Sequence, residues 1–129
     1  MSQKNVEIIR RGWEHWSATG ELRAHPDFVW DVSNLGWPGR QVFAGVEGAN
    51  EFIAEWAGAW DDWEIEVEEY IDAGEHVVAI VNQRGRAKGT GVPVEMQFAQ
   101  VWTFRDGRAI RMEMYSSLDE ALEAAGLRE

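Results

Sequence analysis

Residues Val92–Ser116 read VPVEMQFAQVWTFRDGRAIRMEMYS and predict two long strands joined by a tight turn. Asp106-Gly107 lies near the middle of this segment, and Asp-Gly favours the positive backbone angles of a two-residue hairpin loop. Aromatic and β-branched residues are frequent on both sides of the turn, over Val92–Phe104 and Ala109–Ser116. The segment therefore predicts an antiparallel hairpin from which the rest of a sheet can be extended.

Three further strands are predicted upstream of this hairpin. Glu64–Asp72 and His76–Arg86 flank the turn residues Ala73-Gly74, and residues 85–91 connect the second of them to the hairpin. Phe28–Val32 is rich enough in aromatic and β-branched residues to form another strand, and a loop with Gly36, Pro38 and Gly39 follows it.

Three helices complete the predicted elements. The first has an apolar face and can end at Gly20; this face comprises Val6, Ile9, Trp13 and Trp16. The second is expected from Val46 to about Asp61, with its apolar face formed by Phe52, Ile53, Trp56 and Trp60. Ser117-Leu-Asp-Glu120 is a capping-box pattern that opens a short third helix, which Gly126 closes. Helices followed by a run of antiparallel strands indicate an α+β domain with helices packed on a curved sheet.

Composition excludes several classes of function. The chain has 129 residues with 23 acidic and 12 basic side chains, so its formal charge of −11 argues against nucleic acid and anionic membranes as partners. There is no cysteine, which removes disulfides, thiolate metal sites and cysteine nucleophiles. The three histidines are scattered without metal-ligand spacing. We expect a cytoplasmic protein with no bound metal and no cofactor.

Tryptophan is the most unusual part of the composition. Seven of the eight tryptophans lie between residues 13 and 63, and several recur at helical spacing. Indole rings bury large areas and carry an N–H that needs a partner, so such clustering suits an aromatic-walled pocket as well as a packed core. A pocket for a small hydrophobic molecule is the leading hypothesis.

The chain resembles the SnoaL-like members of the NTF2-like superfamily, which include ketosteroid isomerases and polyketide cyclases. Three stretches carry the resemblance: Gly45-Val-Glu-Gly48, Val101-Trp-Thr-Phe-Arg-Asp-Gly107-Arg and Glu120-Ala-Leu-Glu-Ala-Ala-Gly126-Leu. The resemblance implies a single domain over residues 1–129, a cone formed by a curved, mostly antiparallel sheet wrapped around N-terminal helices, a pocket inside it, and a homodimer packed through the convex face of the sheet. The stretch Glu21–Pro26 is shorter than the second helix of most relatives, which implies a more open pocket.

The resemblance also suggests a general base. Aligning Phe28–Val32 with the family's first strand puts Asp31 at the position of the isomerase base. The oxyanion-hole tyrosine of the isomerases falls on Gly12 and its aspartic partner falls near Ala99, so the standard ketosteroid mechanism is disfavoured. The alternative for Asp31 is structural, because an aspartate before Ser33-Asn34 can accept hydrogen bonds from turn amides.

The register of the long strands decides which side chains line the pocket. In the register that the resemblance implies, the polar residues Asn82, Arg84, Gln97 and Thr103 face inward, beside Ala99 and Val101. The convex face then carries Phe98, Gln100 and Trp102, which would form the dimer interface. The competing register, which hydrophobicity alone favours, turns Met96, Phe98, Trp102 and Phe104 inward instead, and a slip of one residue separates the two.

Two functions follow from these expectations. The first is binding of a small hydrophobic or polycyclic molecule, with cofactor-free isomerase, cyclase or hydratase chemistry in which Asp31 is the base. The second is a non-catalytic ligand-binding or dimerisation domain whose pocket is filled by its own aromatic side chains. The residues expected to contact a ligand are Trp16, Ile53, Trp56, Trp60, Asn82, Arg84, Gln97, Met112 and Met114.

Overall fold

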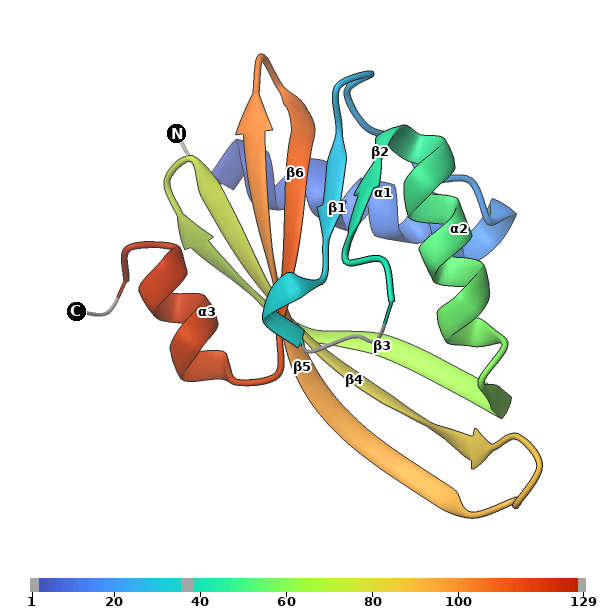
Figure 1. Cartoon of the computed structure of the whole chain (residues 1–129). Coiled ribbons are helices and arrows are strands. Elements are labelled where there is room, and N and C mark those ends of the chain that lie inside the picture. Colours follow the sequence, from blue (N-terminus) through green and yellow to red (C-terminus); the bar gives the residue numbers. More distant parts are fainter. Residues whose placement is uncertain (1–2, 36–38, 128–129) are drawn as a thin grey trace.

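A six-stranded curved sheet with helices on both faces makes up the computed structural model, which describes residues 3–35 and 39–127 (Figure 1). Along the chain the elements are α1 (Gln3–Thr19), β1 (Val29–Asp31), the 3-10 helix η1 (Ser33–Leu35), β2 (Val42–Ala44), α2 (Gly45–Ala57), β3 (Trp60–Ala73), β4 (His76–Ala87), β5 (Pro93–Arg105), β6 (Arg108–Tyr115) and α3 (Leu118–Ala124). The strand order is β2-β1-β6-β5-β4-β3, in which β1 and β6 are parallel and the other pairs antiparallel. The α+β prediction is confirmed.

The turns and caps predicted from local sequence are present. Asp106 and Gly107 both have positive φ, at 53° and 76°, as the two-residue loop between β5 and β6 requires. The Ser117 side chain accepts a hydrogen bond from the Glu120 backbone N–H at the start of α3. These positions depend only on neighbours in the sequence, which is why the sequence predicts them.

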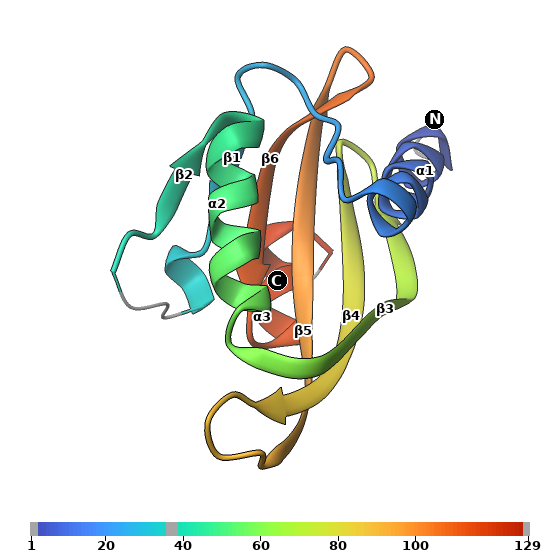
Figure 2. The ribbon, with the colours of Figure 1, turned by 90° about the vertical axis from the view of Figure 1, so that its right-hand side faces the viewer.

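The two faces of the sheet carry different helices. Figure 2 shows α1 and α2 on one face and α3 on the other; we call these the inner and outer faces. Buried side chains of the sheet pack with α1 and α2 on the inner face, among them Val77, Val81, Phe98, Trp102 and Met112. On the outer face a smaller cluster packs under α3; it consists of Val78, Ala99, Val101, Tyr115, Ala121 and Ala125.

The register of β4 and β5 follows hydrophobicity and not the register implied by the resemblance. Phe98 and Trp102 lie in the inner-face core, whereas Ala99 and Val101 lie under α3. The expectation that Asn82, Arg84, Gln97, Thr103, Ala99 and Val101 face inward, toward α1 and α2, is therefore wrong. Successive residues of a strand point to opposite faces, so a slip of one residue would have exposed the aromatic set to solvent.

The end of one helix and the presence of one strand also differ from prediction. Helix α2 ends at Ala57 and not near residue 61, with Gly58 at its C-cap, so Trp60 begins β3. Strand β2 was not predicted, and it pairs with β1 at the sheet edge. Of the predicted loop, Gly36 and Pro38 lie outside the described residues.

Candidate functional site

A cavity of about 530 Å³ lies on the inner face of the sheet, where α1 and α2 lie against it. This volume is within the range of about 300–1,000 Å³ that is usual for small-molecule sites. Its lining comes from the inner-face helices α1 and α2, the connection between α1 and β1, and the sheet, and comprises Ile8, Ile9, Arg11, Gly12, Trp13, Trp16, Leu22, Arg23, Ala24, Trp30, Val46, Phe52, Ile53, Trp56, Trp63, Ile65, Phe98, Gln100, Trp102, Gly107, Arg108, Ala109 and Met114.

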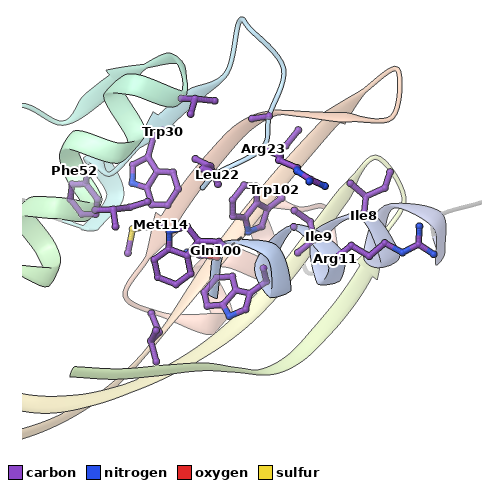
Figure 3. A pocket seen from close by; sticks show the side chains of 18 of the residues that line it. Ile8, Ile9, Arg11, Leu22, Arg23, Trp30, Phe52, Gln100, Trp102 and Met114 are labelled. Carbon is purple, nitrogen blue, oxygen red and sulfur yellow. Dashed lines mark hydrogen bonds between the residues drawn. The ribbon is translucent and has the colours of Figure 1, made fainter. Parts of the chain in front are cut away.

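Aromatic rings in mutual contact form the wall of the cavity. Trp30 lies at the α2 side of Figure 3 and Trp102 nearer α1, and their ring centroids are 6.1 Å apart in an edge-to-face arrangement. Trp30 also contacts Phe52 of α2 at 5.9 Å, and Trp56 contacts Phe98 at 5.8 Å. Pairs of this kind are favourable beyond their burial. The wall therefore consists of rings held by one another.

Two of these indoles are held by one buried amide. The Gln83 side chain, 4% exposed, accepts hydrogen bonds through its Oε1 from the Nε1 atoms of Trp56 at 2.7 Å and Trp63 at 3.1 Å. Gln83 comes from β4, Trp56 from α2 and Trp63 from β3. A single acceptor atom, Gln83 Oε1, therefore orients the two cavity-lining indoles of Trp56 and Trp63.

A second buried amide, Gln100, lines the cavity itself. Its Oε1 accepts a hydrogen bond from Trp102 Nε1 at 3.0 Å. An indole nitrogen can only donate, so the amide oxygen must face it. Among the described residues no partner is found for the Gln100 amide NH2, and this group remains available to a ligand.

The charged lining residues are all basic. They are Arg11, Arg23 and Arg108, and the described lining contains no carboxylate, imidazole or hydroxyl side chain. The cavity therefore offers hydrogen-bond donors and positive charge, but no side chain that could act as an ordinary general base at neutral pH.

The structure brings together some of the residues predicted to contact a ligand. Trp16, Ile53, Trp56 and Met114 line the cavity. Two others miss it although they lie on the same side of the sheet. Met112 is fully buried in the core, and Trp60 packs on Trp56 outside the lining, with ring centroids 6.3 Å apart.

Asn82, Arg84 and Gln97 lie outside this cavity, contrary to prediction. Arg84 Nε donates to Glu64 Oε1 at 2.6 Å, and Asn82 Nδ2 donates to Glu68 Oε1 at 2.7 Å. Gln97 Nε2 donates to Asn82 Oδ1 at 3.0 Å. Their hydrogen bonds are exposed, because the observed register turns these polar side chains to solvent.

Asp31 also points away from the cavity. It follows the cavity residue Trp30 on β1, so the two side chains lie on opposite faces of the sheet. Its carboxylate accepts hydrogen bonds from Ser33 N at 2.8 Å and Ser33 Oγ at 2.6 Å and forms an ion pair with Arg111. The expectation that Asp31 projects into the pocket is wrong, and the turn-amide alternative is confirmed.

The surroundings of Asp31 are those of a structural ion pair. Arg111 also lies 3.7 Å from the Glu113 carboxylate. Burial, together with the neighbouring Glu113 carboxylate, raises the pKa of Tyr115 to about 12. Tyr115 is thus protonated at neutral pH, and Arg111 is shared by the carboxylates of Asp31 and Glu113 on the outer face.

Asp31→Asn tests this structural assignment. We expect the free energy of unfolding to fall by about 1–3 kcal/mol, because hydrogen bonds to charged groups contribute about 1.5–3 kcal/mol. Chemical denaturation measures this change. Asp27→Asn is the control, since the Asp27 side chain is 80% exposed and should be neutral. Unchanged stability together with lost ligand binding would instead place the carboxylate at the cavity.

The predicted dimer interface is wrong in its residues. Phe98, Gln100 and Trp102 are 3%, 3% and 4% exposed in the single chain, and all three line the cavity. They are covered by the chain's own helices and by other core residues, so they cannot form a surface for a partner subunit. The sequence signal that locates Phe98 and Trp102 is the alternation of Met96, Phe98, Trp102 and Phe104 along their strand, because all four pack in or against the inner-face core.

Residues 3–35 and 39–127 contain no group of three or more His, Asp or Glu side chains placed to hold a metal ion. Within the same ranges no helix has the length and apolar character needed to cross a bilayer.

Comparison with solved structures identifies the fold. The chain is similar to TerC co-crystallised with polyporic acid (23% identity, 95% of this chain and 98% of that chain, TM-score 0.69). It is also similar to a protein from Jannaschia sp. assigned to the SnoaL-like polyketide cyclases (22% identity, 99% of this chain and 94% of that chain, TM-score 0.69). A third match is a protein with a ketosteroid isomerase-like fold from Catenulispora acidiphila, in complex with trimethylamine (20% identity, 81% of this chain and 77% of that chain, TM-score 0.61). No curated protein matches the chain in sequence.

The family assignment comes from sequence. The sequence model of the SnoaL-like domain matches residues 8–112, which include most of α1, all of α2, most of the sheet and nearly all of the cavity lining. This agrees with the NTF2-like fold of the structural neighbours. The chain belongs to the SnoaL-like domain family.

Proposed function

We propose that this protein binds a small, largely apolar molecule in the inner-face cavity. The observation that carries the proposal is a volume of about 530 Å³ lined by aromatic rings and a buried amide. Apolar walls with a few placed polar groups are characteristic of small-molecule sites. The volume that remains between the rings favours a bound ligand over the alternative of a pocket filled by its own side chains.

The lining favours binding over acid–base catalysis by Asp31. Proton abstraction needs a base within about 3 Å of the substrate, or one water away. Asp31 lies on the outer face and is held by Ser33 and Arg111. The proposed function is therefore ligand binding, and Asp31 stabilises the fold that holds the cavity.

Two structural neighbours support a small-molecule occupant. TerC was crystallised with polyporic acid, and the Catenulispora protein with trimethylamine. Both share the fold of this chain at low identity. They therefore support the proposal that the cavity holds a small molecule, but they do not indicate the chemistry of that molecule.

Gly12 provides a test of the cavity with a matched control. It lies in the middle of α1, lines the cavity, and a Cβ added there would meet nothing within 4 Å. Gly12→Phe should place a ring in the cavity and lower the affinity for N-phenyl-1-naphthylamine, a neutral aromatic fluorophore, by at least about tenfold, which corresponds to about 1.4 kcal/mol. A fluorescence titration measures this affinity.

Gly12→Ala is the control for the same position. It removes the glycine without filling the cavity, so probe affinity should be unchanged while the free energy of unfolding rises by about 0.5–1 kcal/mol. Failure of the wild-type protein to bind the neutral probe, or equal binding by Gly12→Phe and Gly12→Ala, would contradict the proposed function.

A further inference from the structure

We infer that the ligand of this cavity is an anion: an aromatic molecule with a carboxylate or an ionised phenol or enol, held at its charged end by Arg23 and Arg108. The inference rests on the proposed function and adds the chemical class of the ligand. It is carried by three observations on the polar groups of the lining.

The first observation is a reversal of charge. The chain has 23 acidic and 12 basic side chains, yet the cavity lining contains Arg11, Arg23 and Arg108 and, among the described residues, no acidic side chain. A lining that followed the composition would carry more carboxylates than guanidinium groups. Positive charge gathered at a cavity in an acidic protein attracts anions into that cavity.

The second observation is that two of these guanidinium groups are unpaired. Arg11 lies 3.4 Å from the Glu7 carboxylate, and Figure 3 shows its side chain directed away from the other lining residues. Within the described part of the chain neither Arg23 nor Arg108 has an ion pair or hydrogen bond. The acidic neighbour of Arg23, Glu21, accepts a 2.7 Å hydrogen bond from His15, which is the main cause of its lowered pKa, and the charge of Arg23 makes a smaller contribution without a direct ion pair.

These two arginines come from segments that are joined to each other. Arg23 lies in the connection between α1 and β1, and Arg108 begins β6. The His25 N–H donates to the Ala109 carbonyl at 2.9 Å and ties the two segments together. Arg23 and Trp102 both line the cavity, so its lining combines positive charge with the aromatic wall.

The third observation is an unmatched donor on the cavity wall. Gln100 lines the cavity, and its amide oxygen accepts the hydrogen bond of Trp102 Nε1. Among the described residues its NH2 group has no partner, so this group can donate to an acceptor atom on a ligand.

Together these groups define a ligand by its chemistry. Its rings fit the aromatic wall, an acceptor oxygen meets the Gln100 NH2 group, and its negative group meets Arg23 and Arg108. A carboxylate, or an ionised phenol or enol, offers only acceptors and pairs well with guanidinium. A cationic or donor-rich molecule would leave all of these groups unpaired.

The test uses two fluorescent probes that differ by one charged group. 1-Anilinonaphthalene-8-sulfonate is anionic, and N-phenyl-1-naphthylamine is the same ring system without the sulfonate. The double variant Arg23→Gln, Arg108→Gln should bind the sulfonate probe about tenfold more weakly than wild type in low salt, because charge-assisted hydrogen bonds are lost. Its affinity for the neutral probe should stay within about twofold, since apolar contacts are retained.

Arg105→Gln is the matched control. Arg105 lies opposite Arg108 in the β5–β6 hairpin but does not line the cavity, so its loss removes one positive charge, half the change made by the double variant, and leaves the site intact. It should affect neither probe. The inference would be overturned if Arg105→Gln weakened binding of the sulfonate probe as much as the double variant does, or if the double variant did not weaken it at all. In either case, binding of the neutral probe would still support the proposed function. Failure of wild type to bind either probe would overturn both.

Discussion

Trp102→Glu is expected to unfold the protein. Trp102 is 4% exposed, and its ring contacts Phe28 at 6.0 Å and Trp30 at 6.1 Å between centroids. Its Nε1 donates to the buried Gln100 amide. The substitution removes these contacts and places a carboxylate in an aromatic core, and burying an unpaired charge costs several kcal/mol. Domains of this size are stable by only about 5–15 kcal/mol, so the loss is comparable with the total.

Circular dichroism and thermal melting measure this outcome. Val42→Glu is the control, because it also replaces an apolar strand residue by glutamate but at a site 52% exposed on the edge strand β2. That variant should fold and melt close to wild type, since charges are tolerated on sheet edges. A folded Trp102→Glu protein would show that residue 102 faces outward and would restore the register implied by the resemblance.

Gln83→Leu should lower the free energy of unfolding by about 2–4 kcal/mol, because each buried donor left without a partner costs about 1–3 kcal/mol. The substitution keeps the approximate size of the side chain but removes the acceptor shared by Trp56 and Trp63. Both indoles line the cavity, so the same variant should also bind the neutral naphthylamine probe more weakly.

Chemical denaturation and probe titration together separate this role from simple packing. Gln97→Leu on the neighbouring strand makes the same chemical change at an exposed position, where it should alter stability by less than about 0.5 kcal/mol. The double variant Gln83→Leu, Trp63→Phe also removes one of the two indole donors that Gln83→Leu leaves without an acceptor. Its loss of stability should therefore be smaller than the sum of the losses in the two single variants. Strict additivity would mean that the Trp63 bond to Gln83 contributes nothing.

The family resemblance was right about the fold and misleading about the site. The register implied by the isomerase branch put Asp31 inward, while the apolar alternation of Phe28, Trp30 and Val32 already indicates that Asp31 faces outward. Burying the aromatic side chains contributes more free energy than turning one carboxylate inward, so the aromatic side chains decide which face of β1 is buried. Asp31 occupies the sequence position of the isomerase base but does not have the position in space that this role requires.

Trp60 shows a different kind of error. Its spacing from Trp56 fits a helix, and the prediction extended that helix past Gly58. In the structure α2 ends at Ala57, and the chain enters β3 at Trp60 with Asp62 at φ 53°. Gly58 disfavours continuation of the helix. One more helical turn would contribute little stability, whereas residues from Trp60 onward gain hydrogen bonds by pairing with β4.

The sequence by itself determined the elements that depend on near neighbours. The Asp106-Gly107 turn, the Ser117 cap and the amphipathic helix α1 are set by backbone preferences and by contacts within a few residues. Only the tertiary structure decided the site. Gln83 meets Trp56 and Trp63 across 27 and 20 residues, and Arg23 lines the same cavity as Arg108 because the connection that carries it is hydrogen-bonded to β6 through His25 and Ala109. Contacts of this kind exist only once the sheet has chosen its inner face, and that choice follows from the burial of the whole aromatic set and not from any local signal.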